Sequence, residues 1–186
     1  MRITGGKAKG RLLASLKGMS IRPTSDKVRE AVFNLLGQDI TGLTVLDLFA
    51  GTGSMGIEAL SRGALWAFFI DSSKKSTDLI WKNLVSCGFE DVGFVMKRDL
   101  RVKLPMEQNL LKDGVDIVFL DPPYGKDLIS PTLMKLSKSK ILTSNSLVVA
   151  ESSRRDRLPS RVGNISLSDT RIYGQTKIDI YNSEVS

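Results

Sequence analysis

Histidine is absent from the 186-residue sequence, and cysteine occurs once, as Cys87. The lack of histidine excludes Ser-His-Asp and Cys-His catalysis, histidine metal sites and any acid-base step through an imidazole. A single cysteine excludes an internal disulfide and a CxxC metal site, and it fits a reducing compartment. Any reaction must therefore depend on carboxylates, backbone groups or a cofactor, and we expect no bound metal.

Long hydrophobic runs are missing as well. The longest, residues 65–70, is about six residues long, whereas a helix that spans a bilayer needs roughly 20. The N-terminus also lacks the apolar core of a signal peptide. We therefore expect a cytoplasmic protein that has no contact with a membrane.

Acidic residues are absent from the first 25 positions, which contain six basic residues. The rest of the chain has 21 basic and 20 acidic residues, so the net charge of +7 comes mostly from the N-terminus. A concentrated basic segment favours binding to a phosphate backbone, although a solvated flexible arm has the same composition. Lys7, Lys9 and Arg11 are the candidate RNA-binding residues in this segment.

Residues 1–22 are predicted to form a small basic β-hairpin, with Gly5-Gly6 and Gly10 as turn signals. Because this segment has few apolar residues to bury, we expect it to project from the body of the protein. Residues 23–186 are predicted to form one Rossmann-like domain, since neither an internal repeat nor a linker indicates a second one.

A helix is predicted to begin at residues 23–24, with apolar residues at helical spacing up to Gly37. Beyond it, short apolar strands alternate with helical stretches, which is typical of a parallel sheet covered on both faces. The sequence therefore predicts an α/β fold whose mostly parallel seven-stranded sheet ends in a C-terminal antiparallel hairpin. The predicted strands are residues 44–48, 65–70, 93–96, 115–120, 147–150, 164–172 and 177–181, and the later predicted helices end near 61 and 84 or lie around 100–111 and 129–136.

A glycine-rich segment, DLFAGTGSMG at residues 47–56, lies at the carboxyl end of the first parallel strand. Its glycines satisfy the pattern G-x-G-x-x-G, and Asp71 lies 20 residues beyond Gly51, at the end of the second strand. Such a loop lets backbone N–H groups approach a ligand closely, and an acid at that distance binds ribose hydroxyls. The segment predicts a site for a nucleotide-like cofactor.

Asp47 favours S-adenosyl-L-methionine over a dinucleotide. In a dinucleotide site the strand runs apolar into the first glycine, whereas Asp47 lies four residues before Gly51, where it can attract a methionine ammonium group. Asp99, at the end of the third strand, is expected near the adenine amino group. The candidate cofactor-binding residues are Asp47, Phe49, Ala50, Gly51, Thr52, Gly53, Asp71 and Asp99.

A second informative segment, DPPY at residues 121–124, directly follows the predicted strand 115–120. Its two prolines have no N–H, so the Asp121 carboxylate and a proline carbonyl remain as acceptors for an amino group. Tyr124 adds a flat face on which a base can stack. The candidate catalytic residues are Asp121, Pro122, Pro123 and Tyr124.

The DLFAGTG loop, Asp71 and DPPY together resemble the methyltransferases that use S-adenosyl-L-methionine to modify exocyclic nitrogens. Three N-terminal segments, RITGG at residues 2–6, KGRL at 9–12 and RPTSDKVRE at 22–30, resemble more narrowly the RsmD family of 16S rRNA guanine-N2 methyltransferases. The resemblance covers nearly the whole chain, although Asp71 stands where many relatives have Glu.

The resemblance implies methyl transfer to the exocyclic N2 of a guanine in 16S rRNA, within an assembled or partly assembled small ribosomal subunit. It also adds Arg22 and Arg29 to the RNA-binding candidates. Arg154, Arg155 and Arg157 follow a predicted strand end on the ligand-binding side, where they either extend the RNA surface or form a solvated loop.

Three other functions are compatible with parts of the sequence. An adenine-N6 methyltransferase acting on DNA or RNA shares the DPPY segment. A non-enzymatic RNA-binding protein would use the Rossmann-like body as a scaffold. The DPPY segment argues against it, because binding alone needs no convergent acceptors beside a cofactor pocket. A nicotinamide-dependent oxidoreductase fits the glycine-rich loop, but it is disfavoured because the sequence offers no candidate acid-base residue other than carboxylates.

Overall fold

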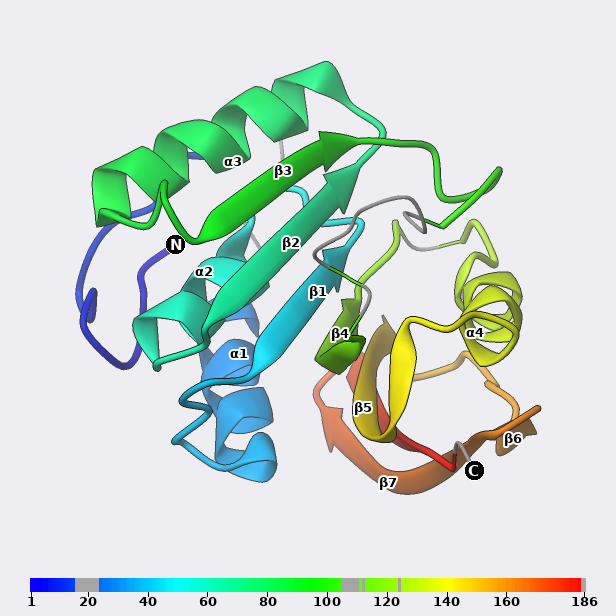
Figure 1. Ribbon diagram of the computed structural model, residues 1–186. Helices are drawn as coiled ribbons and strands as arrows, with labels where there is room; N and C mark the ends of the chain where they lie inside the picture. Colours follow the sequence, from blue (N-terminus) through cyan, green and yellow to red (C-terminus); the bar gives the residue numbers. More distant parts are fainter. Residues whose placement is uncertain (16–23, 105–110, 112, 124, 185–186) are drawn as a thin grey trace.

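The computed structural model describes residues 1–15, 24–104, 111, 113–123 and 125–184, which form a single sheet with flanking helices (Figure 1). The helices are α1 (Thr24–Leu36), α2 (Ser54–Ser61), α3 (Lys74–Cys87) and α4 (Ile129–Ser137). The strands are β1 (Thr44–Leu48), β2 (Trp66–Asp71), β3 (Gly93–Lys97), β4 (Val115–Leu120), β5 (Leu142–Ser153), β6 (Arg161–Val162), β7 (Ile165–Tyr173) and β8 (Thr176–Ser183).

The strand order in the sheet is β3-β2-β1-β4-β5-β8-β7-β6. Strands β1 to β5 pair in parallel, and β8, β7 and β6 continue the sheet in antiparallel pairs. The chain leaves β1 toward β2 on one side, whereas β4 lies on the other side of β1. This reversal places a crevice at the carboxyl ends of β1 and β4, where sheets of this type bind ligands.

Alternate residues of the strands point to two separate apolar cores, as expected for a pleated sheet with period two. Val45 of β1 packs into the core that also contains Val32 and Phe33 of α1. Its neighbour Leu46 packs into the other core, together with Leu133 of α4. Helices α1, α2 and α3 therefore cover one face of the sheet and α4 the opposite face (Figure 1).

Most predicted elements of the sheet and helices are confirmed, but the number of strands and one helix differ from the prediction. The sheet has eight strands instead of seven, because the two-residue strand β6 is too short to produce an apolar run. The helix predicted around 100–111 is absent from residues 100–104, which form a turn and loop, while 105–110 and 112 lie outside the described residues. The Asp99 carboxylate accepts the Arg101 N–H at 2.9 Å, a local bond that competes with helix formation.

The N-terminal segment does not project, contrary to the prediction. Residues 1–15 fold back on themselves with a bridge between Arg2 and Leu12, and they bury Ile3, Ala8 and Leu13 against the body. These three apolar residues, spaced five apart, pack on the core that includes α1 and α2. Glu58 of α2 also holds the segment, because it accepts the N–H groups of Thr4 and Gly5 at 2.9 and 2.8 Å. Residues 16–22 of the predicted hairpin lie outside the described residues.

Gly6 shows how closely this segment approaches α2. Its φ is +74°, and a Cβ at this position would lie 1.7 Å from the Ser61 carbonyl oxygen. The next residue, Lys7, donates its N–H to the same oxygen at 2.7 Å. Only glycine fits here, and the contact places the tip of the segment at the C-terminal end of α2.

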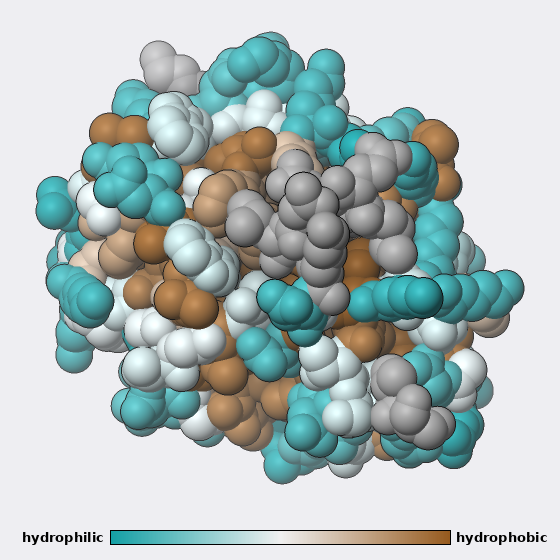
Figure 2. Space-filling model, in the orientation of Figure 1, coloured by the Kyte–Doolittle hydropathy of each residue, from teal (hydrophilic) through white to brown (hydrophobic). Residues whose placement is uncertain are grey.

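Hydrophilic side chains cover much of the face drawn in Figure 2, and hydrophobic residues reach the surface in its middle and at a few places on its outline. Among the described residues, the helices are too short or too polar to cross a membrane.

Candidate active site at the carboxyl edge of the sheet

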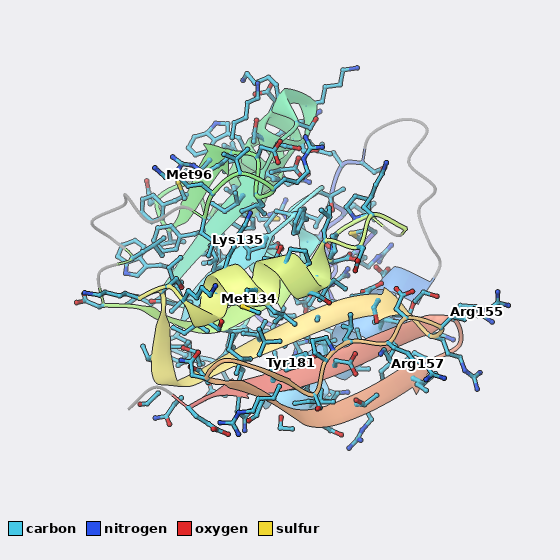
Figure 3. All side chains as sticks on the ribbon, turned by 90° about the vertical axis from the view of Figure 1, so that its right-hand side faces the viewer. Met96, Met134, Lys135, Arg155, Arg157 and Tyr181 are labelled. Atoms are coloured by element: carbon cyan, nitrogen blue, oxygen red, sulfur yellow. The ribbon has the colours of Figure 1, made fainter. Side chains whose placement is uncertain are left out.

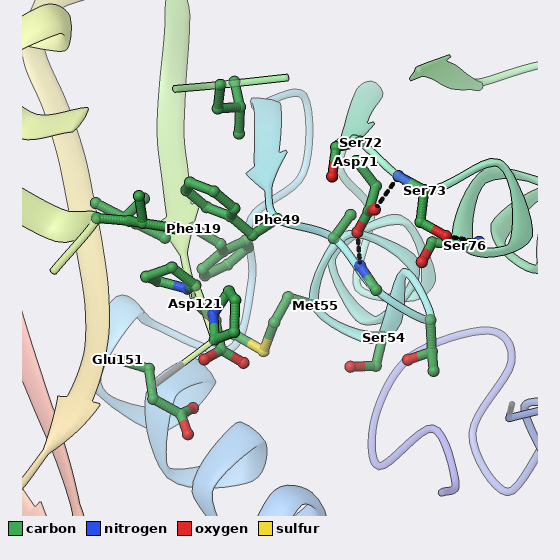
Figure 4. A pocket seen from close by; sticks show the side chains of 18 of the residues that line it. Phe49, Ser54, Met55, Asp71, Ser72, Ser73, Ser76, Phe119, Asp121 and Glu151 are labelled. Atoms are coloured by element: carbon green, nitrogen blue, oxygen red, sulfur yellow. Dashed lines mark hydrogen bonds between the residues drawn. The ribbon is translucent and has the colours of Figure 1, made fainter. Parts of the chain in front are cut away.

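A pocket of about 820 Å³ lies at the carboxyl ends of the parallel strands. The segments that follow β1, β2, β3 and β4 line it, together with the end of β5 and one side of α1 (Figure 4). Its volume is in the upper part of the range of roughly 300–1,000 Å³ that small-molecule sites span. Ten of the predicted residues line it: Arg29, Phe49, Ala50, Gly51, Thr52, Asp71, Asp99, Asp121, Pro122 and Pro123.

The loop after β1 has an unusual backbone conformation. Phe49 has a φ of +60°, followed by Gly51 at +56° and Gly53 at +77°. A non-glycine residue in this region costs on the order of 1–3 kcal/mol, which the surrounding structure must offset. The Ala50 N–H donates to the Ile70 carbonyl at 3.0 Å and so ties the loop to the end of β2. Gly53 does not line the pocket, because it packs against Ile80 of α3 instead.

Asp71, at the end of β2, links that strand to the loop after β1 through hydrogen bonds. One carboxylate oxygen accepts the Gly51 N–H at 2.9 Å, and the other accepts the Ser73 N–H at 2.8 Å (Figure 4). Each carboxylate oxygen has two lone pairs, so Asp71 can still accept bonds from a ligand that enters the pocket. The predicted acid is therefore in place, and it also fixes the shape of the glycine loop.

Asp47 lies outside the pocket lining, so its predicted contact with a ligand stays a prediction. Its side chain is only 3% exposed, and one carboxyl oxygen accepts the Gly56 N–H at 3.0 Å. Burial raises the pKa of Asp47 to about 8, the Gly56 N–H lowers it, and the negative charge of Asp71 raises it. Asp47 thus supports the loop from behind, at the junction of β1 and α2.

Asp99 lines the pocket as predicted, but it also has a partner of its own. Arg101 donates to both of its carboxylate oxygens, through Nε at 3.0 Å and Nη2 at 2.6 Å. This hydrogen bonding lowers the pKa of Asp99 to about 2. Lys135 of α4 holds the turn by donating to the carbonyls of Leu100 and Arg101 at 2.7 and 2.6 Å; Figure 3 shows it on the helix. The Asp99 carboxylate is therefore ionised and fixed in orientation.

The DPPY segment reaches the same pocket from β4. Asp121 is exposed, Pro122 is buried and Pro123 is exposed, and all three line the pocket. Tyr124 lies outside the described residues. The acceptors predicted for an amino group thus share one pocket with Asp71 and the glycine loop.

The predicted RNA-binding role of Arg29 is corrected by its surroundings. Its side chain is 2% exposed, and its Nε donates to Glu58 at 3.1 Å while Nη2 donates to Asp26 at 3.0 Å. Glu58 is fully buried and also pairs with Arg62 at 2.9 Å. Arg29 is therefore committed to a buried ion-pair network. Arg22 lies outside the described residues.

Lys7, Lys9 and Arg11 are exposed, as an RNA-binding role requires, but they do not line the pocket. The backbone of Lys7 contacts Ser61 at the C-terminal end of α2, whereas the glycine loop lies at its N-terminal end. An eight-residue helix is about 12 Å long. The basic tip of the N-terminal segment is therefore separated from the pocket by the length of α2.

Several pocket residues were not identified from the sequence. Ser72, Ser73 and Ser76 come shortly after Asp71. The only sequence feature that could have identified them is this position after a predicted strand that is followed by an acid. Glu151 directly follows the predicted strand 147–150 and could have been found from the same rule, although β5 itself continues to Ser153. Met1 and Ser15 reach the pocket only because the N-terminal segment packs on the body.

Comparison with known proteins assigns the chain to a protein family. A family model described as conserved hypothetical protein 95 matches residues 1–182. The sequence is 33% identical to ribosomal RNA small subunit methyltransferase D of Escherichia coli (strain K12), over 99% of this chain and 90% of that protein. The chain belongs to the RsmD family.

The chain is also similar to a further relative and to a solved structure. The protein of the same name from Haemophilus influenzae is 35% identical, over 83% of this chain and 79% of its own length. The solved structure of the Escherichia coli protein yhhF has a TM-score of 0.84 at 33% identity, covering 100% of this chain and 99% of that one. The described fold is therefore the α/β fold of methyltransferases.

Proposed function

We propose that this protein transfers a methyl group from S-adenosyl-L-methionine to the exocyclic N2 amino group of a guanine in 16S rRNA of the small ribosomal subunit. The observation that carries the proposal is that Asp71 and Asp121 line one pocket, beside a glycine loop that Asp71 itself holds in place. Membership of the RsmD family, whose relatives are named as small-subunit rRNA methyltransferases, supports the choice of RNA.

The pocket residues fit the donor and acceptor groups of S-adenosyl-L-methionine. Asp71 can accept hydrogen bonds from ribose hydroxyls, and the ionised carboxylate of Asp99 can accept them from an adenine amino group. The first turn of α2, where Ser54 and Met55 line the pocket, offers backbone N–H groups to a carboxylate. These residues would hold the cofactor, which supplies a methyl group on a positively charged sulfur with a good leaving group behind it.

Asp121 and Pro122 would act on the substrate amino group. The N2 lone pair of guanine is delocalised into the ring, so the nitrogen is a poor nucleophile until acceptors hold its hydrogens. Two consecutive prolines contribute no N–H, so the segment after β4 presents acceptors without competing donors. On accepting the methyl group, N2 gives up one of its hydrogens as a proton, which the Asp121 carboxylate would accept, and S-adenosylhomocysteine is the other product. In this scheme, positioning and electrostatics account for the rate. Tyr124 is proposed to hold the base by stacking.

Three arginines at the same edge of the sheet are proposed to hold RNA near the pocket. Arg154, Arg155 and Arg157 are exposed, and Figure 3 shows Arg155 and Arg157 pointing away from the body. Within the described residues, no ion pair occupies these three side chains. Their turn is held by the bond from the Arg154 N–H to the Gln175 carbonyl, at 2.8 Å. Unpaired cations on a fixed turn suit a phosphate backbone.

Two measurements test the proposal. Thermal shifts with S-adenosylhomocysteine and with NAD separate the cofactor classes, and we expect stabilisation by S-adenosylhomocysteine alone. Small subunits from a strain that lacks the gene are then incubated with the enzyme and labelled S-adenosyl-L-methionine and digested to nucleosides. Label in N2-methylguanosine supports the proposal, whereas label in N6-methyladenosine would assign the enzyme to adenine instead.

A further inference from the structure

Glu151 is a second carboxylate beside Asp121. The parallel register pairs Leu120 of β4 with Ala150 of β5, so the next residue on each strand is an acid. Both acids line the pocket, Asp121 directly after β4 and Glu151 two residues before the end of β5, and Figure 4 labels both. Glu151 is half-buried and lies opposite Ile178 of β8. The methyl-transfer scheme above uses Asp121 and gives Glu151 no role.

We propose that Glu151 determines specificity for guanine by accepting the N1–H of the target base while Asp121 and the Pro122 carbonyl accept the N2 hydrogens. This inference rests on the proposed function and names the feature of the base that the pocket recognises. Guanine presents N1–H and the N2 amino group side by side on its Watson–Crick edge. An ionised carboxylate is an acceptor only, and it therefore matches this edge.

The same arrangement disfavours adenine. The N1 atom of adenine is an acceptor, so Glu151 would direct its negative charge at a lone pair. Phe119, Val149 and Ile178 are apolar residues that line the pocket beside the two acids, as the register of β4, β5 and β8 requires. A site that is built to bond a substrate N–H and that excludes water rejects an analogue without it strongly.

The test compares guanine with 2-aminopurine at the mapped target site of reconstituted small subunits. 2-Aminopurine keeps the reactive C2 amino group but has an acceptor at N1. We expect kcat/KM of the wild-type enzyme to be about 100-fold or more lower on 2-aminopurine. In Glu151→Gln the amide can accept from N1–H or donate to N1, so the preference for guanine is expected to fall by about tenfold or more.

The matched control is Glu90→Gln, because Glu90 is exposed and does not line the pocket. It should keep the wild-type preference, and affinity for S-adenosylhomocysteine should be unchanged in both variants. Equal wild-type rates on the two bases, or an unaltered preference in Glu151→Gln with normal cofactor affinity, would overturn the role of Glu151. Because 2-aminopurine also lacks O6, a slow wild-type reaction on it shows only that the guanine edge is recognised, and the lower preference of Glu151→Gln assigns that recognition to Glu151. Equal wild-type rates on the two bases contradict the proposal even if the variant does not fold. Failure of the wild-type enzyme to methylate guanine would instead contradict the proposed function.

Discussion

The carboxylate of Asp71 accepts the backbone N–H of Gly51 at 2.9 Å, across a separation of 20 residues. This bond joins the end of β2 to the loop after β1. The acid that is proposed to bind ribose therefore also sets the conformation of the loop that is proposed to bind the rest of the cofactor. Loss of Asp71 should affect both.

Asp71→Ala should weaken S-adenosyl-L-methionine binding, because charged acceptors contribute about 1.5–3 kcal/mol per bond, which corresponds to roughly 10-fold to 150-fold in Kd. Calorimetric titration measures the affinity. Asp78→Ala is the matched control, since Asp78 lies on α3 with a 61% exposed side chain. Wild-type affinity in Asp71→Ala would remove this residue from the site.

Asp121→Ala should keep cofactor affinity near that of the wild type but slow methyl transfer by about a hundredfold or more, since it removes a contact to the reacting amino group. Single-turnover kinetics isolate this step. Asp113→Ala, an exposed acid just before β4, should transfer at the wild-type rate. An unaltered transfer rate in Asp121→Ala would refute the role given to the DPPY segment.

Asp47 should make stability depend on pH. Burial raises its pKa to about 8 in the folded protein, against about 3.9 in the unfolded chain. Between these values the folded state binds the extra proton, so the free energy of unfolding should fall as pH rises, by up to about 1.4 kcal/mol per pH unit. The Asp47 contribution is fully present below about pH 4 and is lost as pH rises through about 8.

Asp47→Asn should remove this dependence while keeping an acceptor for the Gly56 N–H. Urea unfolding of the wild type and the variant at several pH values between 5 and 8 measures the difference. The free energy of unfolding of the wild type minus that of Asp47→Asn should decrease as pH rises. A difference that stays constant over this range would show that Asp47 does not titrate there.

Glu58→Ala should destabilise the protein by about 3–5 kcal/mol, because it leaves the buried cations of Arg29 and Arg62 without their shared partner. It should also speed amide hydrogen exchange at Thr4 and Gly5, whose N–H groups donate to Glu58 at 2.9 and 2.8 Å. Glu30→Ala, an exposed position on α1, should change little. Unfolding free energy and exchange rates like those of the wild type would contradict the anchoring role of Glu58.

Two sets of basic residues can be compared directly for RNA binding. Each cation that neutralises a phosphate contributes up to about −0.7 to the log-log salt slope for single strands. Replacing Arg154, Arg155 and Arg157 with Ala should therefore reduce the slope by about two units. The equivalent variant of Lys7, Lys9 and Arg11 should do the same only if RNA extends along α2 to the far end of the helix.

Small-subunit affinity measured at several salt concentrations separates these cases. Cofactor affinity should be unchanged in both triple variants. An unchanged slope in the variant of residues 154, 155 and 157 would assign these arginines to a solvated loop.

The sequence was sufficient to predict the parts of the site that follow from local patterns. Parallel strands bring their carboxyl ends to one edge, so the acids at positions 71, 99 and 121 could be expected together. The loop after β1 could be predicted because its glycines adopt positive φ angles that other residues rarely tolerate. Periodicity was likewise enough to predict α1 and its end before Gly37.

The remaining features depend on contacts between distant residues, which leave no local pattern. Arg29 resembles a surface arginine in the sequence, and its burial follows from contacts with the distant Glu58 of α2 and the Arg2 carbonyl. The packing of the N-terminal segment depends on the fit of Gly6 against Ser61. The burial of Asp47 could not be distinguished from ligand binding, because both place an acid at the end of β1.

The most direct test of the central claim is to map the methylated nucleotide in small subunits taken from a strain without the gene. The subunits are treated with the wild-type enzyme or with Asp121→Ala in the presence of labelled S-adenosyl-L-methionine, and fragments of the 16S rRNA are sequenced by mass spectrometry. We predict a single guanine that carries the label on N2 after wild-type treatment and almost none after treatment with the variant. Label on adenine, label scattered over many nucleotides, or equal labelling by the two enzymes would contradict the account.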